Sequence, residues 1–300
     1  MNRGLKGGNY AVLSESDLLR IHESSIELLE TQGLLCESDL TFKLFQQNGA
    51  LVDSNTNIIR VSRDMVESAL KTAPKSFWMY GRDAQYDMEV SVGRVYFGMG
   101  GTPEPFIYDH GLRGPRIPNN RDMISCTQVG QALSNIDFVM ALCSTRDVRP
   151  EESIYYEYDA IFRNTTKPVI CSSPGKRKTE LYIELAAAAS GGEENLRKRQ
   201  WITLFTQPVS PLKITRYSEG MFAAAEYGIP ILASPGPMMG ATSPASLAGT
   251  LVQINAEALF GVVMSQLIKP GTPVIYAPHT GVMDMTTAQC TYGSAEQTLA

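Results

Sequence analysis

The first ninety residues carry apolar positions at helical spacing. Ser14 and Asp17 have the spacing of a capping box, and apolar residues including Ile21 and Leu28 follow with a helical period. Gly33 suits the position that ends such a helix. Further helices are predicted over about 38–48 and 62–72, with a short strand at 58–61. We therefore expect a small, mostly helical N-terminal domain over residues 1–90, with no catalytic feature.

From about residue 90 the pattern changes to short β-rich runs that alternate with longer helical stretches. The runs lie at 94–97, 136–142, 168–171, 201–206, 229–233 and 273–277. The helical stretches between them cover 120–133, 152–164, 178–190, 217–227 and 244–267. This alternation is typical of βαβ units and a parallel sheet. The runs are nearly continuous in apolar character, as expected when helices cover the sheet.

Two α/β architectures fit this pattern. We interpret residues 91–300 as a TIM (β/α)8 barrel truncated to about six β/α units, because eight units typically need about 250 residues and a last helix opens only at Ser294. The alternative is an open, doubly wound sheet that is complete with six strands. Against it, the one dinucleotide-like turn begins at Gly98 and Gly100 but has Pro103 in the third glycine position.

Composition excludes several classes of protein. The chain has 26 Lys and Arg against 31 Asp and Glu, a net charge of −5, which argues against a nucleic-acid partner. No uninterrupted apolar run reaches 18 residues and the N-terminus has no hydrophobic signal region, so we expect no membrane span and no secretion. The five cysteines form no Cys-x-x-Cys pair, which excludes a disulfide framework and a zinc knuckle. We expect a soluble, cytoplasmic protein.

The predicted strand ends carry little acid–base chemistry. In a barrel these ends form the active face, and here they hold one histidine, His279, one arginine, Arg146, and no carboxylate. Hydrolysis by paired carboxylates or a catalytic triad needs more, and the chain has no H-E-x-x-H, G-x-S-x-G or Walker motif. A small, apolar, aromatic-flanked face suits a methylated ammonium held by π systems. Glu257, within an apolar helix, is better explained as a capping or inter-helix contact than as a catalytic group.

Several segments resemble a known family. They include 235–244 (PGPMMGATSP), 270–276 (PGTPVIY), 100–103 (GGTP) and 207–212 (QPVSPL). Together they closely resemble the trimethylamine methyltransferase family of corrinoid-dependent methyltransferases, and the match covers essentially the whole chain. The resemblance implies a TIM-barrel enzyme that moves a methyl group from a methylated amine to the cobalt of a separate corrinoid protein. In the founding members a pyrrolysine stands in the C-terminal part of the barrel, a region that corresponds to positions after Ala300.

The resemblance also shapes the expected site. Many relatives act on quaternary amines such as glycine betaine, and we favour that class over trimethylamine. We expect no tightly bound cofactor, since the cobalamin is carried by the corrinoid protein, and no metal ligand or catalytic side chain; we also expect a homo-oligomer. Seven residues are predicted to bind substrate: Tyr96, Phe97 and Tyr276 as aromatic walls, Gln207, Ser210 and His279 as anchors for a substrate carboxylate, and Met239 as a wall near the corrinoid.

Two other functions fit the same sequence. One is a barrel lyase or aldolase, which needs a Schiff-base lysine at a strand end, and no run ends in lysine. The other is a non-catalytic binding protein for methylated amines.

Overall fold

The centre of the protein is a parallel sheet whose strands follow the order of the chain. The computed structural model describes residues 4–8, 10–100, 106–108, 111 and 114–299, so Pro103 of the glycine-rich turn lies outside the described residues. The sheet consists of β8 (Val169–Ser172), β9 (Ile202–Thr206), β11 (Ile231–Ala233) and β13 (Val274–Tyr276). Single parallel bridges, Val139 to Val169 and Gly98 to Phe138, extend it by two further segments. The predicted mixed α/β fold with a parallel sheet is confirmed.

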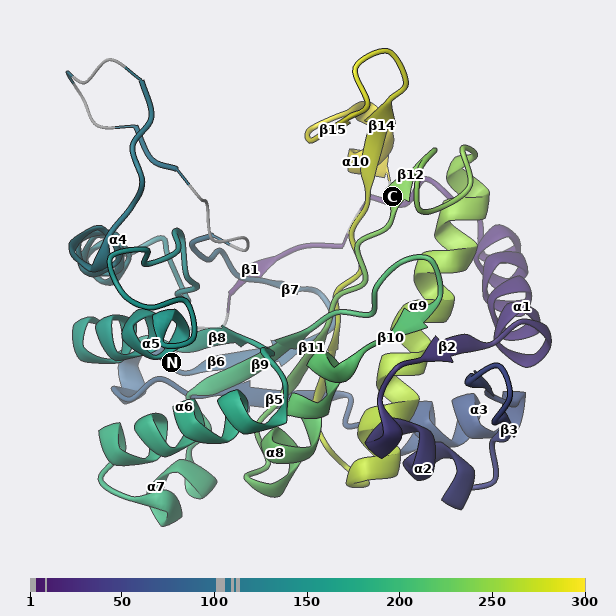
Figure 1. Cartoon of the computed structure of the whole chain (residues 1–300), viewed down its shortest axis with the longest axis horizontal. Helices are drawn as coiled ribbons and strands as arrows, with labels where there is room; N and C mark the ends of the chain where they lie inside the picture. Colours follow the sequence, from purple (N-terminus) through teal and green to yellow (C-terminus); the bar gives the residue numbers. More distant parts are fainter. Residues whose placement is uncertain (1–3, 9, 101–105, 109–110, 112–113, 300) are drawn as a thin grey trace.

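The helices that connect these strands lie on one side of the sheet (Figure 1). They are α4 (Asn120–Ala132), α5 (Ser153–Asn164), α6 (Lys176–Ala189), α8 (Gly220–Glu226) and α9 (Leu247–Ile268), and α7 (Glu193–Lys198) is a short addition after α6. Each of the five connecting helices packs against the next in chain order. A doubly wound sheet has the strand order 3-2-1-4-5-6 and helices on both faces, so this arrangement differs from that alternative.

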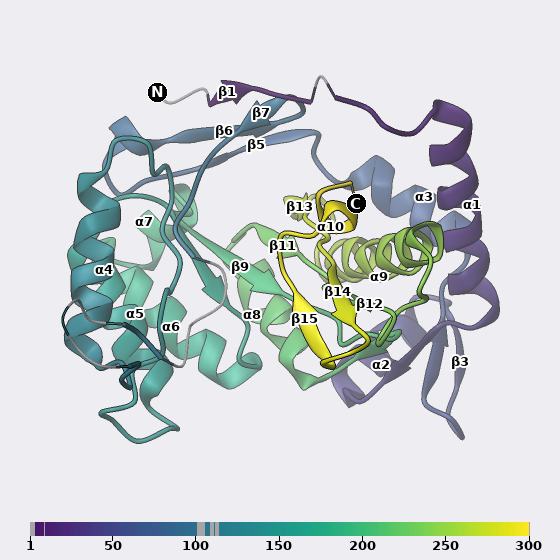
Figure 2. The same cartoon turned by 90° about the horizontal axis from the view of Figure 1, so that it is seen from above.

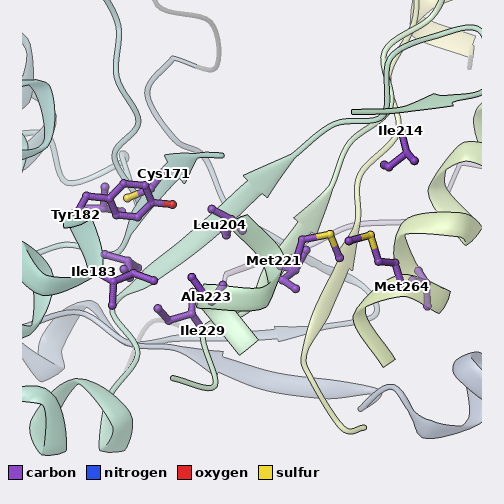
Figure 3. Packing of buried hydrophobic residues seen from close by; sticks show 14 of the residues in the cluster. Cys171, Tyr182, Ile183, Leu204, Ile214, Met221, Ala223, Ile229 and Met264 are labelled. Carbon is purple, nitrogen blue, oxygen red and sulfur yellow. The ribbon is translucent and has the colours of Figure 1, made fainter. Parts of the chain in front are cut away.

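Strand alternation divides the side chains of the sheet into two sets. Cys171, Leu204 and Ile231 occupy one cross-strand row and face the helices, where they join the main hydrophobic core. Figure 3 shows part of this core, in which Met221 of α8 and Met264 of α9 point toward one another.

The opposite face of the sheet carries a second, smaller apolar cluster. The neighbouring row, Phe205 and Leu232 with Ile275, contributes to it together with Ile170. The antiparallel hairpin of β5 (Ser76–Met79) and β6 (Met88–Ser91), with the short helix η1 (Ala84–Tyr86) at its turn, supplies the other half of this cluster.

The hairpin lies near the amino ends of the parallel strands. The backbone N–H of Tyr80 donates to the carbonyl of Gln200 at 3.3 Å, and that of Arg82 donates to Thr166 at 2.8 Å. Gln200 and Thr166 shortly precede β9 and β8. Figure 2 shows the hairpin lying alongside the sheet. The opposite, carboxyl ends of the strands are thus the side on which a pocket can open.

Two predicted strands are wrong in detail. The run 94–97 contains β7 (Arg94–Val95), which pairs antiparallel with β1 (Leu5–Lys6), and the parallel contact begins only at Gly98. A β-carbon at Gly98 would lie 2.1 Å from the Phe138 ring, so the close approach of the two segments requires glycine. The run 136–142 makes single bridges rather than a continuous strand.

The N-terminal region contains the three predicted helices: α1 (Glu15–Thr31), α2 (Asp39–Gln47) and α3 (Arg63–Thr72). The Ser14 capping box is present, with Asp17 N–H donating to Ser14 Oγ at 3.2 Å. The strands between the helices are β2 (Leu34–Cys36), β3 (Leu51–Asp53) and β4 (Ile58–Arg60), and β2 also pairs in parallel with β10 (Lys213–Ile214). All three helices pack on α9. The domain boundary at residue 90 stays a prediction.

A second small sheet is an element that the sequence pattern did not predict. It consists of β12 (Met238–Met239), β14 (Gly281–Asp284) and β15 (Gln289–Thr291). The helix predicted to open at Ser294 is present as α10 (Ala295–Leu299). A 3-10 turn, η2 (Arg216–Glu219), precedes α8.

Helix α9 is the element whose composition bears on the membrane prediction. Within the described residues it is one helix that is long and apolar enough to cross a membrane by length and composition alone. In the fold, 67% of its apolar window is buried, because α1, α2, α3 and α8 surround it. Its composition therefore reflects its place in the core.

Candidate active site

A cavity of about 950 Å³ opens at the carboxyl ends of the parallel strands. Its deeper wall consists of inward-facing side chains of the sheet, including Ile170, Phe205 and Leu232. Two positions farther along each strand, alternation places Ser172, Gln207 and Ser234 on the same face, and all three line the cavity. Later segments complete the lining with Met238, Thr242, His279 and Tyr292.

The lining is apolar and aromatic and carries hydroxyl and amide groups rather than charges. Phe138, Phe205, Tyr217 and Tyr292 supply aromatic rings. Among the described residues, no Asp, Glu, Lys or Arg lines the cavity. The described part of the chain also has no group of three His, Cys, Asp or Glu side chains that could hold a metal ion. Such a pocket binds ligands by shape and dispersion, with a few polar groups setting orientation.

His279 is the one ionisable side chain other than tyrosine that lines this cavity in the described residues. Its Nδ1 lies 3.2 Å from Ser234 Oγ, and Ser234 Oγ also donates to the Ala277 carbonyl at 2.7 Å. Burial lowers the pKa of His279 below its usual value. The opposite ring nitrogen, Nε2, faces Gly236, where a β-carbon would lie only 2.5 Å away.

A buried carboxylate fixes the loop that follows β9. Glu257, on α9, is 0% exposed. It accepts hydrogen bonds from Ser210 Oγ at 2.6 Å, the Leu212 backbone N–H at 2.9 Å and Gln253 Nε2 at 3.0 Å. Burial raises the pKa of Glu257. The peptide bond between Ser210 and Pro211 in this loop is cis. Glu257 thus holds the segment that carries Gln207, in agreement with a structural rather than a catalytic role.

Three of the seven predicted site residues meet in the cavity: Gln207, Ser210 and His279. The hydroxyl of Ser210 is already donated to Glu257. The three residues that were predicted as polar anchors therefore lie together in one cavity. Whether they bind substrate stays a prediction.

The other four predicted residues lie elsewhere. Tyr96 packs with the hairpin cluster and donates its hydroxyl to the Glu89 carbonyl at 2.8 Å. Phe97 is 54% exposed, and Met239 is buried in β12. Tyr276 lines a separate cavity of about 420 Å³ between α1 and α9, which His279 also borders.

The predicted site does not include the aromatic walls of the cavity. Phe205 stands two residues before Gln207 in a predicted strand, so alternation alone places the two on one face. The same signal was available for Phe138 and Met140. Tyr217 and Tyr292 come from connecting segments, for which no periodic signal exists.

The chain is similar to a known protein family and to curated methyltransferases. The model of the family described as trimethylamine methyltransferase (MTTB) matches residues 3–300. Trimethylamine methyltransferase MttB of Desulfitobacterium hafniense (strain DSM 10664 / DCB-2) is 34% identical over 97% of this chain and 59% of its own length. Glycine betaine methyltransferase of Desulfitobacterium hafniense (strain Y51) is 31% identical over 96% of this chain and 60% of its own length.

Solved structures also align with this chain. The monomethylamine methyltransferase MtmB of Methanosarcina barkeri aligns with a TM-score of 0.47 and 15% identity, covering 94% of this chain and 62% of that chain. The present chain spans about 60% of the length of the curated relatives it matches. On the strength of the match over residues 3–300, the chain belongs to the trimethylamine methyltransferase family.

Proposed function

We propose that this protein transfers a methyl group from a methylated amine to the cobalt of a separate corrinoid protein, and that its six parallel segments are an arc of a TIM barrel. The observation that carries the proposal is the aromatic cavity at the carboxyl ends of the strands, whose described lining holds no carboxylate. That is the face on which TIM-barrel enzymes place their active sites. Strand order in chain sequence, with helices on one side, supports the arc.

The cavity suits the electrostatics of methyl transfer from an ammonium ion. Positive charge on nitrogen falls as the carbon–nitrogen bond breaks, so an adjacent carboxylate would stabilise the ground state more than the transition state. Aromatic faces such as those of Phe138 and Phe205 attract the cation more weakly. The residues of this chain therefore orient the amine and exclude water from it. The reduced cobalt supplied by the partner is the nucleophile.

The decisive experiment mixes the protein with a reduced corrinoid and either trimethylamine or glycine betaine, and follows the absorbance of methyl-cobalt. We expect a spectral change with at least one amine. Binding of an amine without any spectral change would instead support the non-catalytic binding protein. The lyase or aldolase is disfavoured, since no lysine among the described residues lines the cavity.

Two variants link the activity to this cavity. Phe205→Ala removes an aromatic wall and should raise the KM for the amine at least several-fold. Phe97→Ala is the matched control, because Phe97 lies outside the cavity lining and is 54% exposed. Equal effects of the two substitutions, with both proteins folded by circular dichroism, would place the site elsewhere.

A further inference from the structure

The hydrogen bonds around Ser234 determine which nitrogen of His279 carries a proton. A serine hydroxyl has one proton to donate, and a carbonyl oxygen can only accept. Ser234 Oγ lies 2.7 Å from the Ala277 carbonyl, so its proton is used there. The 3.2 Å contact with His279 Nδ1 then requires Nδ1 to be the donor and Ser234 Oγ the acceptor.

The other ring nitrogen is consequently an acceptor. In a neutral imidazole one nitrogen carries the proton and the other presents a lone pair. Burial lowers the pKa of His279, which favours the neutral ring at pH 7. The described residues that line the two cavities bordering His279 include no Asp, Glu, Lys or Arg, and the other ionisable groups there are His22 and tyrosines. The described lining therefore contains no Asp, Glu, Lys or Arg side chain that would alter the preference of His279 for the neutral ring.

Gly236 keeps the lone pair accessible. A β-carbon at this position would lie 2.5 Å from His279 Nε2 and 2.8 Å from Gln207 Nε2. All three residues line the cavity. The absence of a side chain at Gly236 thus leaves open the space that Nε2 faces, and a ligand atom can occupy it.

We propose that His279 Nε2 accepts a hydrogen bond from the N–H of a protonated amine, so that the pocket selects methylated ammonium ions that carry a proton, such as trimethylammonium, over quaternary ones. The proposal rests on the proposed methyl transfer and deepens it by naming the side chain that distinguishes protonated from quaternary amines. It assigns His279 the opposite role from the carboxylate anchor expected from the sequence, because a lone pair repels a carboxylate.

The chemistry balances without proton transfer to the protein. When the carbon–nitrogen bond of trimethylammonium breaks, its electron pair stays on nitrogen, the methyl group passes to the nucleophile, and neutral dimethylamine leaves with its proton. Removing that proton first would force an amide anion to leave. A histidine whose pKa is lowered by burial is a weak base, so it holds the N–H in place and leaves the proton on nitrogen.

The first test reads the tautomer directly. The chain has three histidines, so nitrogen-15 NMR of the full chain, with His22→Gln and His110→Gln to assign the signals, isolates His279. We expect the neutral Nδ1–H form. In Ser234→Ala, which removes the acceptor, we expect the Nε2–H form to appear, and Ser234→Thr should restore the original one. An Nε2–H tautomer in the wild type would overturn the proposal.

The second test compares trimethylammonium with tetramethylammonium chloride by calorimetry. A hydrogen bond from a charged donor predicts about tenfold tighter binding of trimethylammonium, and His279→Leu and Ser234→Ala should both lose most of this preference. Equal affinity, tighter binding of tetramethylammonium, or binding of neither cation by the wild type would overturn the proposal. Equal affinity together with methyl-cobalt formation refutes only the choice of substrate class. A trimethylammonium preference without methyl transfer from any amine refutes the proposed function.

Discussion

Substitution of Glu257 probes how the pocket loop is fixed. In Glu257→Ala two N–H donors lose an acceptor: the Leu212 backbone N–H, and one N–H of the Gln253 amide, which keeps its other bond to the Thr242 carbonyl. The Ser210 hydroxyl also loses this acceptor but can rotate. An unsatisfied buried donor costs about 1–3 kcal/mol, so the two together predict a loss of about 2–6 kcal/mol in unfolding free energy. Glu257→Gln keeps one carbonyl oxygen for these two donors, and the Ser210 hydroxyl can turn to accept from the new amide. Its cost at pH 7 should stay below about 1 kcal/mol.

The cost of Glu257→Gln should also depend on pH. Burial raises the pKa of Glu257 above its ordinary value of 4.5. A carboxyl group with a raised pKa in the folded state binds its proton more tightly there than in the unfolded chain. Its contribution to stability is therefore complete below pH 4.5 and is lost as the pH rises through the folded pKa. Since glutamine resembles the protonated acid, the penalty of Glu257→Gln should shrink between pH 5 and pH 7.5.

Urea unfolding followed by circular dichroism at these two pH values measures both effects. Burial also raises the pKa of Glu157. Because Glu157 is present in every variant, its contribution to the pH dependence cancels when the unfolding free energies of variant and wild type are subtracted. Glu194→Gln is the control, because its side chain is 87% exposed and should cost less than about 0.5 kcal/mol. The reasoning is refuted if Glu257→Ala costs no more than Glu257→Gln, or if the glutamine penalty grows with pH.

Three further predictions follow from the packing. Gly236→Ala places a β-carbon 2.5 Å from the histidine nitrogen that faces the pocket, and should weaken trimethylammonium binding about tenfold by calorimetry; unchanged affinity would contradict the placement of the ligand. Lys167→Met removes two 2.7 Å hydrogen bonds to carbonyls at the end of α4 and should lower the free energy of unfolding in urea by about 2–4 kcal/mol. The control Lys71→Met, at an exposed side chain, should be nearly neutral. Similar costs for the two variants would contradict this. Burial raises the pKa of Cys143 to about 12. Iodoacetamide at pH 8 should therefore modify Cys290 well before Cys143, as measured by mass spectrometry. The reverse order of modification would contradict this.

The parallel sheet could be predicted because strands covered on both faces are continuous apolar runs. The predicted run 168–171 differs from β8 by a single residue at each end. The position of helix α9 could be predicted from the sequence, but the helices that it contacts could not. Neighbours on several sides require apolar residues all around it, so periodicity does not show which helices it contacts.

The candidate site was only partly predictable. Gln207 and His279 follow predicted strands, which predicts a place at the site, and both line the cavity. The same position predicts a place there for Phe97, but its strand turns away to pair with β1 before the parallel contact begins. The contact between Ser234 and His279 joins residues that are 45 positions apart in the chain. It depends on the register of β11 and β13, for which the sequence holds no local signal.

The β5–β6 hairpin has a consequence for the order of binding. Met79 and Met88 share an apolar cluster with Ile170, which lines the cavity, so within the described residues the hairpin covers the pocket on the side of the amino ends of the strands. A small molecule in the pocket then exchanges with solvent on the side of the carboxyl ends, where the cavity opens. If the acceptor protein of the proposed reaction docks at the same carboxyl ends, it covers this opening, so the amine binds before the acceptor protein and the demethylated amine leaves after it.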